Sequence, residues 1–475
     1  MIHSEMTDYR DNPYFNLFSK QKANQYTIGK STYNQRIKKL NVLQRAVEVT
    51  YREHIKEALQ KDLSKPVVET ELSEIYQIVG DIKFTKTYLH QWMRKQKVKT
   101  PLSMLGASSY YLYESKGVCL IISPWNFPFN LTFGPLVSAI AAGNTVIIKP
   151  SEMTPHSSAL MAKIIADVFK EDEVALVEGE VEASTQLLKL PFNHIFFTGS
   201  PNVGKIIMSA ATKHLTSVTL ELGGKSPTII DKTANIDMAA KKIVWGKYLN
   251  AGQICVAPDY VLIDESIETD FINACKKWIK KFYSEQPENS RSFARIVTDK
   301  HFNRLKSHIE NAKSLNAKFE VGGELDAESK YIAPTLVSHL KEDATLLQDE
   351  IFGPILPIVT YKNLNEAISY INAKERPLAL YIYSKSKSNI KKVIAHTRAG
   401  GTCINNNVIH YANHNLPFGG TNNSGIGKSH GFFGFEAFSN KRAIVKQHTF
   451  GISEYLFPPY ESVKEKLARL TVKWF

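Results

Sequence analysis

The sequence predicts an α/β protein built on parallel β-sheets, and two regions of the chain carry that prediction. From residue 118 to residue 221, short runs rich in β-branched and aromatic residues alternate with segments of helical length. A second alternation of the same kind begins at residue 228 and ends near residue 405. Strands that alternate with helices form parallel sheets with right-handed crossovers, and ligands bind at the carboxyl ends of such strands.

The composition is that of a multidomain globular protein. The chain has 475 residues, of which 43% are hydrophobic and 22% are charged. At about 100–200 residues per domain, this length predicts roughly two to four domains. These values exclude a single small module, global disorder and a collagen-like chain. The net charge of +13 favours an acidic partner, whether a polyphosphate cofactor, a nucleic acid or an anionic lipid.

The elements are expected in the following order. Before about residue 96 the pattern is helical, with an apolar stripe formed by Leu40, Leu43, Val47 and Tyr51. In the first series we expect strands at 118–122, 145–148, 174–177, 195–197 and 218–220, and helices near 131–142, 155–169, 182–190 and 203–211. Thr154 before Pro155 predicts a capped helix start. In the second series we expect strands at 228–230, 260–263, 355–361 and 402–405 and a helix over 234–249, before a glycine-rich loop region.

The four cysteines indicate a reducing compartment. Cys119, Cys255, Cys275 and Cys403 lie far apart and form no Cys-x-x-Cys pair, which argues against a disulfide framework and a cysteine zinc site. Residues 1–20 mix charged with apolar residues and lack the pattern of a signal peptide. The apolar stretches are interrupted and shorter than the ~20 residues that span a bilayer. We therefore expect a cytoplasmic protein.

Three residues are candidates for covalent chemistry. Cys255 lies in a predicted loop, where a thiol can face a cleft, although most cysteines are small buried hydrophobes. Glu221 stands at the carboxyl end of a predicted strand, where it is either an acid or base near substrate or a solvated carboxylate. Asn126, in a stiff loop between two prolines, is either a hydrogen-bond donor to a developing oxyanion or an ordinary turn residue.

Two further segments suit a nucleotide. Lys149 and Glu152 follow the next predicted strand and can hydrogen-bond ribose hydroxyls, although charges at strand ends are also ordinary surface. The loop from Gly199 to Gly204 joins a strand to a helix, where backbone amides and the helix dipole receive a phosphate. It is not a Gly-x-Gly-x-x-Gly motif, so its pattern alone does not specify a dinucleotide.

Six motifs then identify a family resemblance. They are PWNFP at 124–128, KPSE at 149–152, FTGS at 197–200, LELGGK at 220–225, GQIC at 252–255 and EIFGP at 350–354. In this order and spacing the chain resembles the aldehyde dehydrogenase superfamily from about residue 31 to residue 438. The segments GQICVAPDYVL at 252–262, FGPILPI at 352–358 and LPFGGTNNSGIGKSHG at 416–431 are similar to class 3, a group of dimeric enzymes that act on fatty and aromatic aldehydes.

The resemblance implies roles for individual residues. It implies Cys255 as the nucleophile, Glu221 as the general base, and Asn126 as an oxyanion donor together with the backbone amide of Cys255. It implies a site for NAD, with NADP as the second option, formed by Lys149, Glu152, Gly199, Ser200, Val203, Gly204, Leu222, Glu350 and Phe352. The implied reaction oxidises an aliphatic aldehyde of medium or long chain, or an aromatic one, to its acid through a thiohemiacetal and a thioester on Cys255.

The resemblance also divides the chain. It implies an aldehyde dehydrogenase-like fold with a Rossmann-type dinucleotide-binding domain over 1–220, an arm hairpin near 109–116, and an α/β catalytic domain over 221–405. Residues 406–475 are expected to hold the glycine-rich loop, a small β oligomerisation arm near 437–445 and a basic tail, in a homodimer. The chain departs from many class 3 members at Asn405-Asn406-Asn407, where they have Asn-Asp, and it carries no long apolar C-terminal anchor.

Two other functions stay open at this point. With the same fold, the thioester can pass to coenzyme A, in which case Glu221 is not needed as a hydrolytic base. Alternatively, the chain is a non-catalytic binder that uses its basic surface. Free acid as the product excludes the first alternative, and aldehyde-dependent formation of NADH excludes the second.

Several remaining features favour simpler interpretations. His410 and His414 have the spacing of two ligands on a helix, but their neighbours predict a loop without a third ligand, so no metal site is expected. A lysine cluster at 276–281 is expected on the solvated face of a helix, and no nucleic-acid partner is expected.

The C-terminal segment 461–475 predicts a basic amphipathic helix. Val463, Leu467, Leu470 and Trp474 recur at helical spacing, and cationic residues occupy other positions. The favoured interpretation is that this apolar stripe packs on the protein itself or across a dimer. The alternative is peripheral attachment to an anionic membrane.

Overall fold

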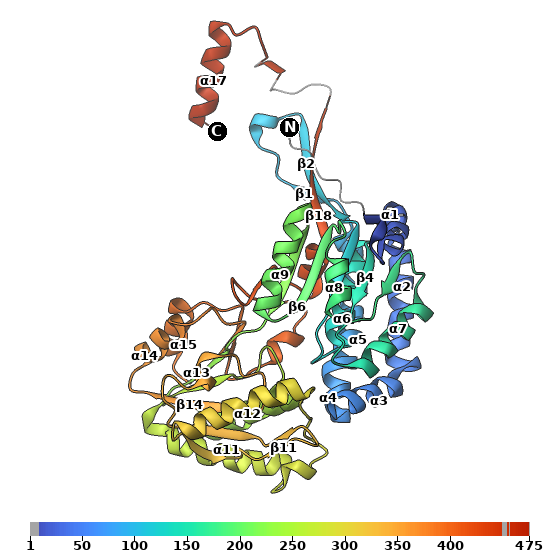
Figure 1. The fold of residues 1–475 in the computed structure, drawn as a ribbon. Coiled ribbons are helices and arrows are strands. Elements are labelled where there is room, and N and C mark those ends of the chain that lie inside the picture. Colours follow the sequence, from blue (N-terminus) through green and yellow to red (C-terminus); the bar gives the residue numbers. More distant parts are fainter. Residues whose placement is uncertain (1–8, 449–453, 456, 475) are drawn as a thin grey trace.

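The computed structural model describes residues 9–448, 454–455 and 457–474, which form two large sheets and a projecting arm (Figure 1). The first sheet has the strand order β17-β7-β6-β3-β4-β5. Its strands are β3 (Val118–Ile122), β4 (Thr145–Lys149), β5 (Val174–Leu176), β6 (His194–Gly199), β7 (Ser217–Leu222) and β17 (Gly425–Ile426). All neighbouring pairs from β3 to β7 are parallel, and β17 pairs antiparallel with β7. The α/β class and the five parallel strands of this series are confirmed.

The register of this sheet brings four strand ends to one edge. Ile122 pairs with Lys149 on one side and with Phe197 on the other. Gly199 pairs with Leu222. The loops that follow β3, β4, β6 and β7 therefore start close together, as expected for the ligand-binding edge of a parallel sheet.

Helices pack around the first sheet and bury three of the four residues of the predicted apolar stripe, whereas Tyr51 stays partly exposed and its hydroxyl donates to Asp167. They are α1 (Phe15–Gly29), α2 (Tyr33–Arg45), α3 (Arg52–Leu63), α4 (Val67–Thr70), α5 (Tyr76–Trp92), α6 (Asn130–Ala142), α7 (Pro155–Val168), α8 (Val181–Leu187) and α9 (Pro201–Ala211). Single π-helical turns, η2 (Ala46–Thr50) and η3 (Glu71–Ile75), interrupt the N-terminal helices. Leu40, Leu43 and Val47 are fully buried and share a core cluster with Ile121 and Ile148 of the sheet.

The start of α7 corrects one prediction. Pro155 does occupy its first turn, but the side chain of Thr154 makes no capping hydrogen bond to the described residues. The carboxylate of Asp62, from α3, instead accepts from the backbone N–H groups of His156 and Ser157 at 3.2 and 2.8 Å. A neighbouring helix supplies the cap here, so a local sequence pattern could not reveal it.

The second sheet has the order β10-β13-β14-β9-β8-β15-β16 and is parallel except for its edge strand β10. Its strands are β8 (Pro227–Ile230), β9 (Tyr260–Asp264), β10 (Lys318–Val321), β13 (Thr335–Ser338), β14 (Ile355–Tyr361), β15 (Ala379–Tyr383) and β16 (Gly401–Ile404). The main helices around it are α10 (Ile236–Tyr248), α11 (Glu268–Tyr283), α12 (Asp299–Ser314), α14 (Leu364–Asn372) and α15 (Lys387–His396). The chain passes from the first sheet to the second over residues 223–226.

The lysine-rich face of α11 matches its prediction as a solvated helix surface. Three of its lysines form ion pairs with neighbouring carboxylates: Lys276 with Glu320, Lys277 with Asp237, and Lys280 with Glu285. The opposite side of the helix buries Phe271, Ile272, Cys275 and Ile279.

The arm is a three-stranded antiparallel sheet of β1 (Gln96–Val98), β2 (Ala107–Ser115) and β18 (Ser439–Gln447). Strand β18 pairs with β2 along its length, from Ser439 opposite Ser115 to Gln447 opposite Ala107. The expected hairpin near 109–116 is corrected, because these residues lie in the single strand β2 and the hairpin is formed by β1 and β2.

The C-terminal helix α17 (Ser462–Trp474) confirms the helical prediction for this segment. Figure 1 shows it beyond the arm, away from both large sheets. Val463, Leu467 and Leu470 are 66%, 43% and 45% exposed, so the described part of the stripe does not pack on its own subunit. The side chain of Trp474 is not among those described. Within the described ranges, every helix is too short or too polar to cross a bilayer.

Candidate active site

A cavity of about 450 Å³ lies where the ligand-binding edge of the first sheet meets the second. Its walls come from the loop after β3, the ends of β6 and β7, the loop before β9, and the helix α12. Eight of the predicted site residues line it: Asn126, Gly199, Ser200, Glu221, Leu222, Cys255, Glu350 and Phe352. Residues from segments more than 200 positions apart thus meet in one cleft. We call this space the cofactor cavity.

Cys255 follows a tight turn that only certain residues permit. Asn250 and Ala251 both have left-handed backbone angles, with φ of 50° and 51°. Gly252 follows with φ of 74°, and a Cβ there would collide with the carbonyl of Gly353. Glycine is therefore required at this position, both for its backbone angle and for the close approach. The turn carries the following residues up to Cys255 into the cleft.

Cys255 also lines a second cavity, of about 260 Å³. Its lining is mostly apolar and includes Val68, Leu72, Phe127, Leu131, Trp245, Leu249, Ile254, Val408, Ile409 and Tyr411. Among the described residues, this space shares only Leu131 and Cys255 with the cofactor cavity. The thiol therefore stands where the two cavities meet. We call the second space the apolar cavity.

The Cys255 thiol rests in its protonated form. Burial, followed by the nearby carboxylates of Glu221 and Glu350, raises the pKa of this thiol well above its usual range. A thiol in that state needs a base before it can act as a nucleophile.

Glu221 is the carboxylate placed to serve as that base. It belongs to β7 and is 5% exposed, and burial raises its pKa to about 7. The Ser429 hydroxyl donates a hydrogen bond to its carboxylate, and Lys428 adds a favourable charge, so both oppose that rise. A group that is half ionised near neutral pH suits proton transfer in both directions. The glycine-rich loop region therefore supports Glu221.

Asn126 is held with one amide hydrogen left over. It is 3% exposed, and its Nδ2 donates to the carbonyl of Gln253 at 2.9 Å. The backbone carbonyl of Asn126 accepts a hydrogen bond from Nδ2 of Asn250 at 3.0 Å. Because a side-chain amide has two hydrogens, the second can serve a ligand oxygen. The loop that carries Asn126 and the turn before Cys255 are thus joined directly by hydrogen bonds.

Glu350 and Phe352 line the cofactor cavity from the segment between α13 (Thr345–Gln348) and β14. Burial raises the pKa of Glu350 to about 7, and a Cβ on Gly223 would collide with its carboxylate. Phe352 has a left-handed backbone with φ of 46°, and its ring lies 5.3 Å from that of Trp125. A non-glycine residue in this region is uncommon and typical of a functional loop.

The β6–α9 turn lies at the same edge. Ser200 begins α9 by accepting from the backbone N–H of Val203 at 3.4 Å, and its carbonyl accepts from that of Gly204. Because Pro201 has no N–H, the Asn202 amide is the first-turn donor left for an anion. Val203 and Gly204 themselves do not line the cavity. A Cβ on Gly204 would approach Leu222 to 2.7 Å, so this glycine serves close packing of α9 on β7.

Lys149 and Glu152 lie at the end of β4 but outside the lining of the cofactor cavity. The Lys149 ammonium is 2% exposed and donates to the carbonyl of Pro150 at 2.6 Å and to Glu152 at 3.3 Å. Glu152 is about one third exposed. The two residues therefore contact each other, and Glu152 presents a carboxylate to solvent beside the sheet edge.

The sequence analysis missed one wall of the cofactor cavity. His301, Arg304 and His308 line it from α12. Arg304 donates to the carbonyls of Glu350 and Ile351 at 3.3 and 2.7 Å, and so supports the segment that carries Glu350. Burial lowers the pKa of His301 to about 4, so its ring is neutral. An amphipathic helix pattern gave no signal for this role, because it does not show which cleft the helix borders.

The histidines and asparagines near residue 410 have local partners. His410 Nδ1 lies 3.3 Å from Cys403 Sγ, whereas His414 Nδ1 lies 2.9 Å from Asp81, so the two rings face different groups. Asn407 is fully buried, and its Nδ2 donates to the carbonyl of Lys242 and to the Tyr383 hydroxyl. These side chains therefore hold neighbouring segments of the protein together.

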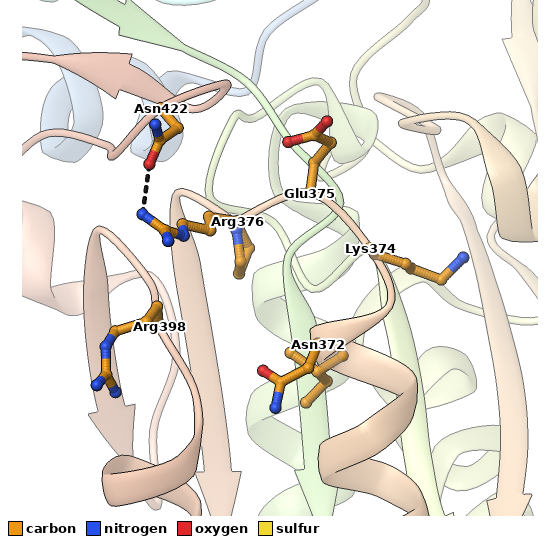
Figure 2. Close-up of a pocket in the computed structure, with 8 residues that line it drawn as sticks. Asn372, Lys374, Glu375, Arg376, Arg398 and Asn422 are labelled. Atoms are coloured by element: carbon orange, nitrogen blue, oxygen red, sulfur yellow. Dashed lines mark hydrogen bonds between the residues drawn. The ribbon is translucent and has the colours of Figure 1, made fainter.

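A further hollow of about 440 Å³ lies near the start of β15, and Figure 2 shows its lining. Arg376 points toward Asn422, to which it donates, while Lys374 and Arg398 point away from each other. Lys374 donates to the carbonyl of Leu347 and Arg398 to that of Thr397. Because the cations do not converge and already bind backbone oxygens, this surface carries no candidate site.

Comparison with known proteins assigns the family. The model of the aldehyde dehydrogenase family matches residues 16–444. The 4,4'-diaponeurosporen-aldehyde dehydrogenase of Staphylococcus aureus is 43% identical, over 90% of this chain and 92% of that protein. The dimeric NADP-preferring aldehyde dehydrogenase of Rattus norvegicus is also 43% identical, over 86% and 89%. The substrate-bound structure of Staphylococcus aureus AldH superposes with a TM-score of 0.94 at 41% identity, over 97% of this chain and 100% of that one. The chain therefore belongs to the aldehyde dehydrogenase family and is an NAD(P)-dependent enzyme that oxidises an aldehyde to the acid.

Proposed function

We propose that this enzyme oxidises apolar aldehydes, either aliphatic ones of medium or long chain or aromatic ones. The observation that carries the proposal is the apolar cavity, which reaches Cys255 separately from the cofactor cavity. Side chains such as Phe127, Leu249 and Ile409 offer a hydrocarbon tail favourable burial. The printed name of the Staphylococcus aureus relative refers to a diaponeurosporen aldehyde, which is consistent with an apolar substrate.

In the proposed chemistry, Glu221 accepts the proton of the Cys255 thiol, and the thiolate adds to the aldehyde carbon. The carbonyl oxygen becomes an oxyanion that receives hydrogen bonds from the Asn126 amide and the backbone N–H of Cys255. When bound, the nicotinamide accepts the hydride that converts the adduct into a thioester. Glu221 releases the thiol proton to solvent and then accepts a proton from water, while the water oxygen attacks the thioester carbon. The Cys255 sulfur leaves as a thiolate, and Glu221 returns the proton to it as the acid departs.

The residues of the cofactor cavity fit a dinucleotide. Buried Glu350 carries a carboxylate that can accept from ribose hydroxyls, and Gly223 permits the close approach that this carboxylate makes. The Asn202 amide, in the first turn of α9 beside Ser200, suits a phosphate oxygen of the pyrophosphate. Phe352 and Trp125 supply flat apolar surface for a ring.

We propose hydrolysis rather than transfer to coenzyme A as the final step. The support is Glu221, a buried carboxylate with a pKa near 7 that lines the same cavity as Cys255. A carboxylate in this state can activate water at neutral pH. Free acid as the product, in equal amounts with and without added coenzyme A, is the expected result, and a thioester product would contradict it.

We propose NAD as the preferred cofactor, with NADP accepted. A carboxylate at Glu152 repels a 2′-phosphate, and the Lys149 cation beside it is already bound to Glu152 and to a backbone oxygen. The rat relative is named for its preference for NADP, so both cofactors belong in the test.

One assay tests the proposed activity. Straight-chain aldehydes of increasing length, branched aldehydes and aromatic aldehydes are each supplied with NAD or NADP, and NADH or NADPH is followed by its absorbance. We expect KM to fall as the straight chain lengthens, by roughly threefold to fourfold per methylene while the apolar cavity fills. A KM that is independent of chain length would contradict the assignment of that cavity.

We propose that the protein is a homodimer and that α17 packs against the partner subunit. The arm projects from the body, the apolar side chains of α17 are exposed, and the rat relative is named as dimeric. Sedimentation of the full chain and of a chain that ends before Ser462 tests this, and the truncated chain should dimerise more weakly. Salt-sensitive binding of the full chain to anionic vesicles, lost on truncation while the dimer persists, would instead establish membrane attachment.

We also propose a reducing, cytoplasmic location. All four cysteines are free thiols, and Cys119 and Cys275 are fully buried as small hydrophobes. A thiol nucleophile such as Cys255 is best preserved where thiols stay reduced. Fractionation of cells with an antibody against the intact protein checks the location.

A further inference from the structure

A buried ion pair lies behind the loop that carries Asn126. Lys65, between α3 and α4, and Glu74, in η3, are joined at 2.7 Å, and both side chains are completely buried. Neither residue lines the cofactor cavity or the apolar cavity. Removing two charges from water is costly unless hydrogen bonds compensate for it, so the remaining partners of this pair indicate what it holds in place.

The hydrogen-bond and ring partners of the two side chains belong to the segment 126–130, and the charge of Glu69 acts on Lys65 as well. The Lys65 ammonium donates to the carbonyl of Asn126 at 3.3 Å and lies 3.9 Å from the centre of the Phe127 ring. The Glu74 carboxylate accepts from the backbone N–H of Asn130 at 2.8 Å. One ion pair thus contacts the segment 126–130 at its first, second and last residues, the last of which begins α6.

The contact at Asn130 replaces a missing helix cap. Asn130 is the first residue of α6, and the preceding Phe129 provides no side-chain cap. A helix N-terminus has unsatisfied N–H groups and a partial positive charge, both of which favour a carboxylate. Glu74 supplies that carboxylate from another helical segment and so fixes where the loop enters α6.

The contact at Asn126 acts on the proposed oxyanion donor. The carbonyl of Asn126 is held by Lys65 on one side and by Asn250 on the other. With its backbone oxygen fixed by two donors, the peptide plane cannot rotate freely, and the side-chain amide keeps the direction set by its bond to Gln253. Pre-oriented donors are what an oxyanion site requires.

We propose that Lys65 and Glu74 are positioning residues for the reaction, which orient the Asn126 amide by fixing both ends of the segment 126–130. This inference rests on the proposed role of Asn126 as oxyanion donor. It adds two residues that lie outside both cavities and act only through that loop.

The test is a cycle of three variants: Lys65→Met/Glu74→Gln, Asn126→Ala, and their combination. The first replaces the pair by neutral side chains of similar size, which avoids an unpaired buried charge. The rate of the first NADH burst, followed by stopped-flow absorbance, reports formation of the oxyanion adduct and hydride transfer. We expect a loss of about 10–100-fold for the pair variant, as for a misplaced catalytic group, and of about 100–1000-fold for Asn126→Ala.

The variant that combines all three substitutions decides whether the ion pair acts through Asn126. If the pair acts through Asn126, its removal in the Asn126→Ala background should cost no more than about twofold, because the donor it orients is already gone. Alkylation of Cys255 by iodoacetamide should keep its wild-type rate in the pair variant, which shows that the nucleophile and the cleft are intact. A loss in the Asn126→Ala background equal to that in the wild type would overturn the inference and assign the pair to the fold as a whole.

Two controls complete the experiment. Lys276→Met/Glu320→Gln removes an ion pair between α11 and β10 that touches neither cavity, and its burst rate should match the wild type. If the pair variant fails to fold, Lys65→Gln/Glu74→Gln keeps a donor for the Asn126 carbonyl and an oxygen for the Asn130 N–H without an unpaired charge, and it should show a smaller loss of the same pattern. If the pair variant keeps the wild-type burst rate while Asn126→Ala is impaired, the positioning role of Lys65 and Glu74 is wrong but the proposed oxyanion role of Asn126 stands. An unimpaired Asn126→Ala enzyme removes the proposed oxyanion role as well.

Discussion

Replacement of Ser429 by alanine should move the acid limb of the pH–rate profile upward. The Ser429 hydroxyl donates to the buried carboxylate of Glu221, whose pKa is about 7 with that bond present. A hydrogen bond to a charged group contributes about 1.5–3 kcal/mol, which corresponds to roughly 1–2 pKa units. The bond stabilises the ionised form, so its loss raises the pKa of Glu221 to about 8–9.

The sign of the effect on rate follows from the role of Glu221 as a base. At pH 7 about half of Glu221 is ionised in the wild type, and about 1–10% in Ser429→Ala, so turnover at pH 7 should fall about 5–50-fold. At about pH 10 the carboxylate is ionised in both enzymes, and turnover of the variant should recover. Steady-state formation of NADH across this pH range, at saturating aldehyde and cofactor, measures the limb.

A matched control separates this effect from loss of a buried hydroxyl in general. Ser439 is also buried, and its hydroxyl donates to the carbonyl of Phe435 at 2.6 Å. Ser439→Ala should therefore keep its acid limb near pH 7. An acid limb of Ser429→Ala that stays near pH 7, or a loss of rate that persists at high pH, would refute the reasoning.

Three other predictions follow from the same site. Cys255→Ser should lose aldehyde oxidation by several orders of magnitude, because a hydroxyl lacks the thiolate form, while Cys275→Ser should stay active; NADH absorbance decides between them. Glu221→Gln should lose both the NADH burst and turnover, because the Cys255 thiol then lacks the base that deprotonates it, and a full burst followed by slow turnover would show that Glu221 acts only in hydrolysis of the thioester. Glu152→Gln should shift the ratio of kcat/KM values towards NADP because a repulsive charge is lost, and an unchanged ratio would show that this carboxylate does not face the ribose.

The architecture was largely predictable because its signals are local. Alternation of β-rich and helical segments predicted the parallel strands from β3 to β7, and the stripe of Leu40, Leu43 and Val47 predicted a buried helix face. The errors arose where a partner lies far away in the sequence. The capping carboxylate of α7 comes from Asp62, more than 90 residues before the helix, whereas the predicted association of the segments near 109–116 and 437–445 is confirmed by the pairing of β2 with β18.

The candidate site was predictable only in part for the same reason. Motifs predicted that Cys255, Glu221 and Asn126 belong together, and the structure places all three in one cavity. The groups that tune or hold them were not identified, because the segment 416–431 that contains Ser429 does not show which carboxylate it faces, and Arg304 lies on an ordinary amphipathic helix. Their roles depend on which carboxylate or carbonyl the fold brings near, and a single sequence does not record that distance.

The near-complete separation of the two cavities has a consequence for how this enzyme can change. Because their linings share only Leu131 and Cys255 among the described residues, substitutions on the apolar side can alter which aldehydes are accepted while the affinity for the dinucleotide stays constant. Selection or engineering can therefore treat the two specificities as nearly independent traits. Leu131 is the exception, because its side chain borders both spaces, and variation there links the choice of substrate to the fit of the cofactor.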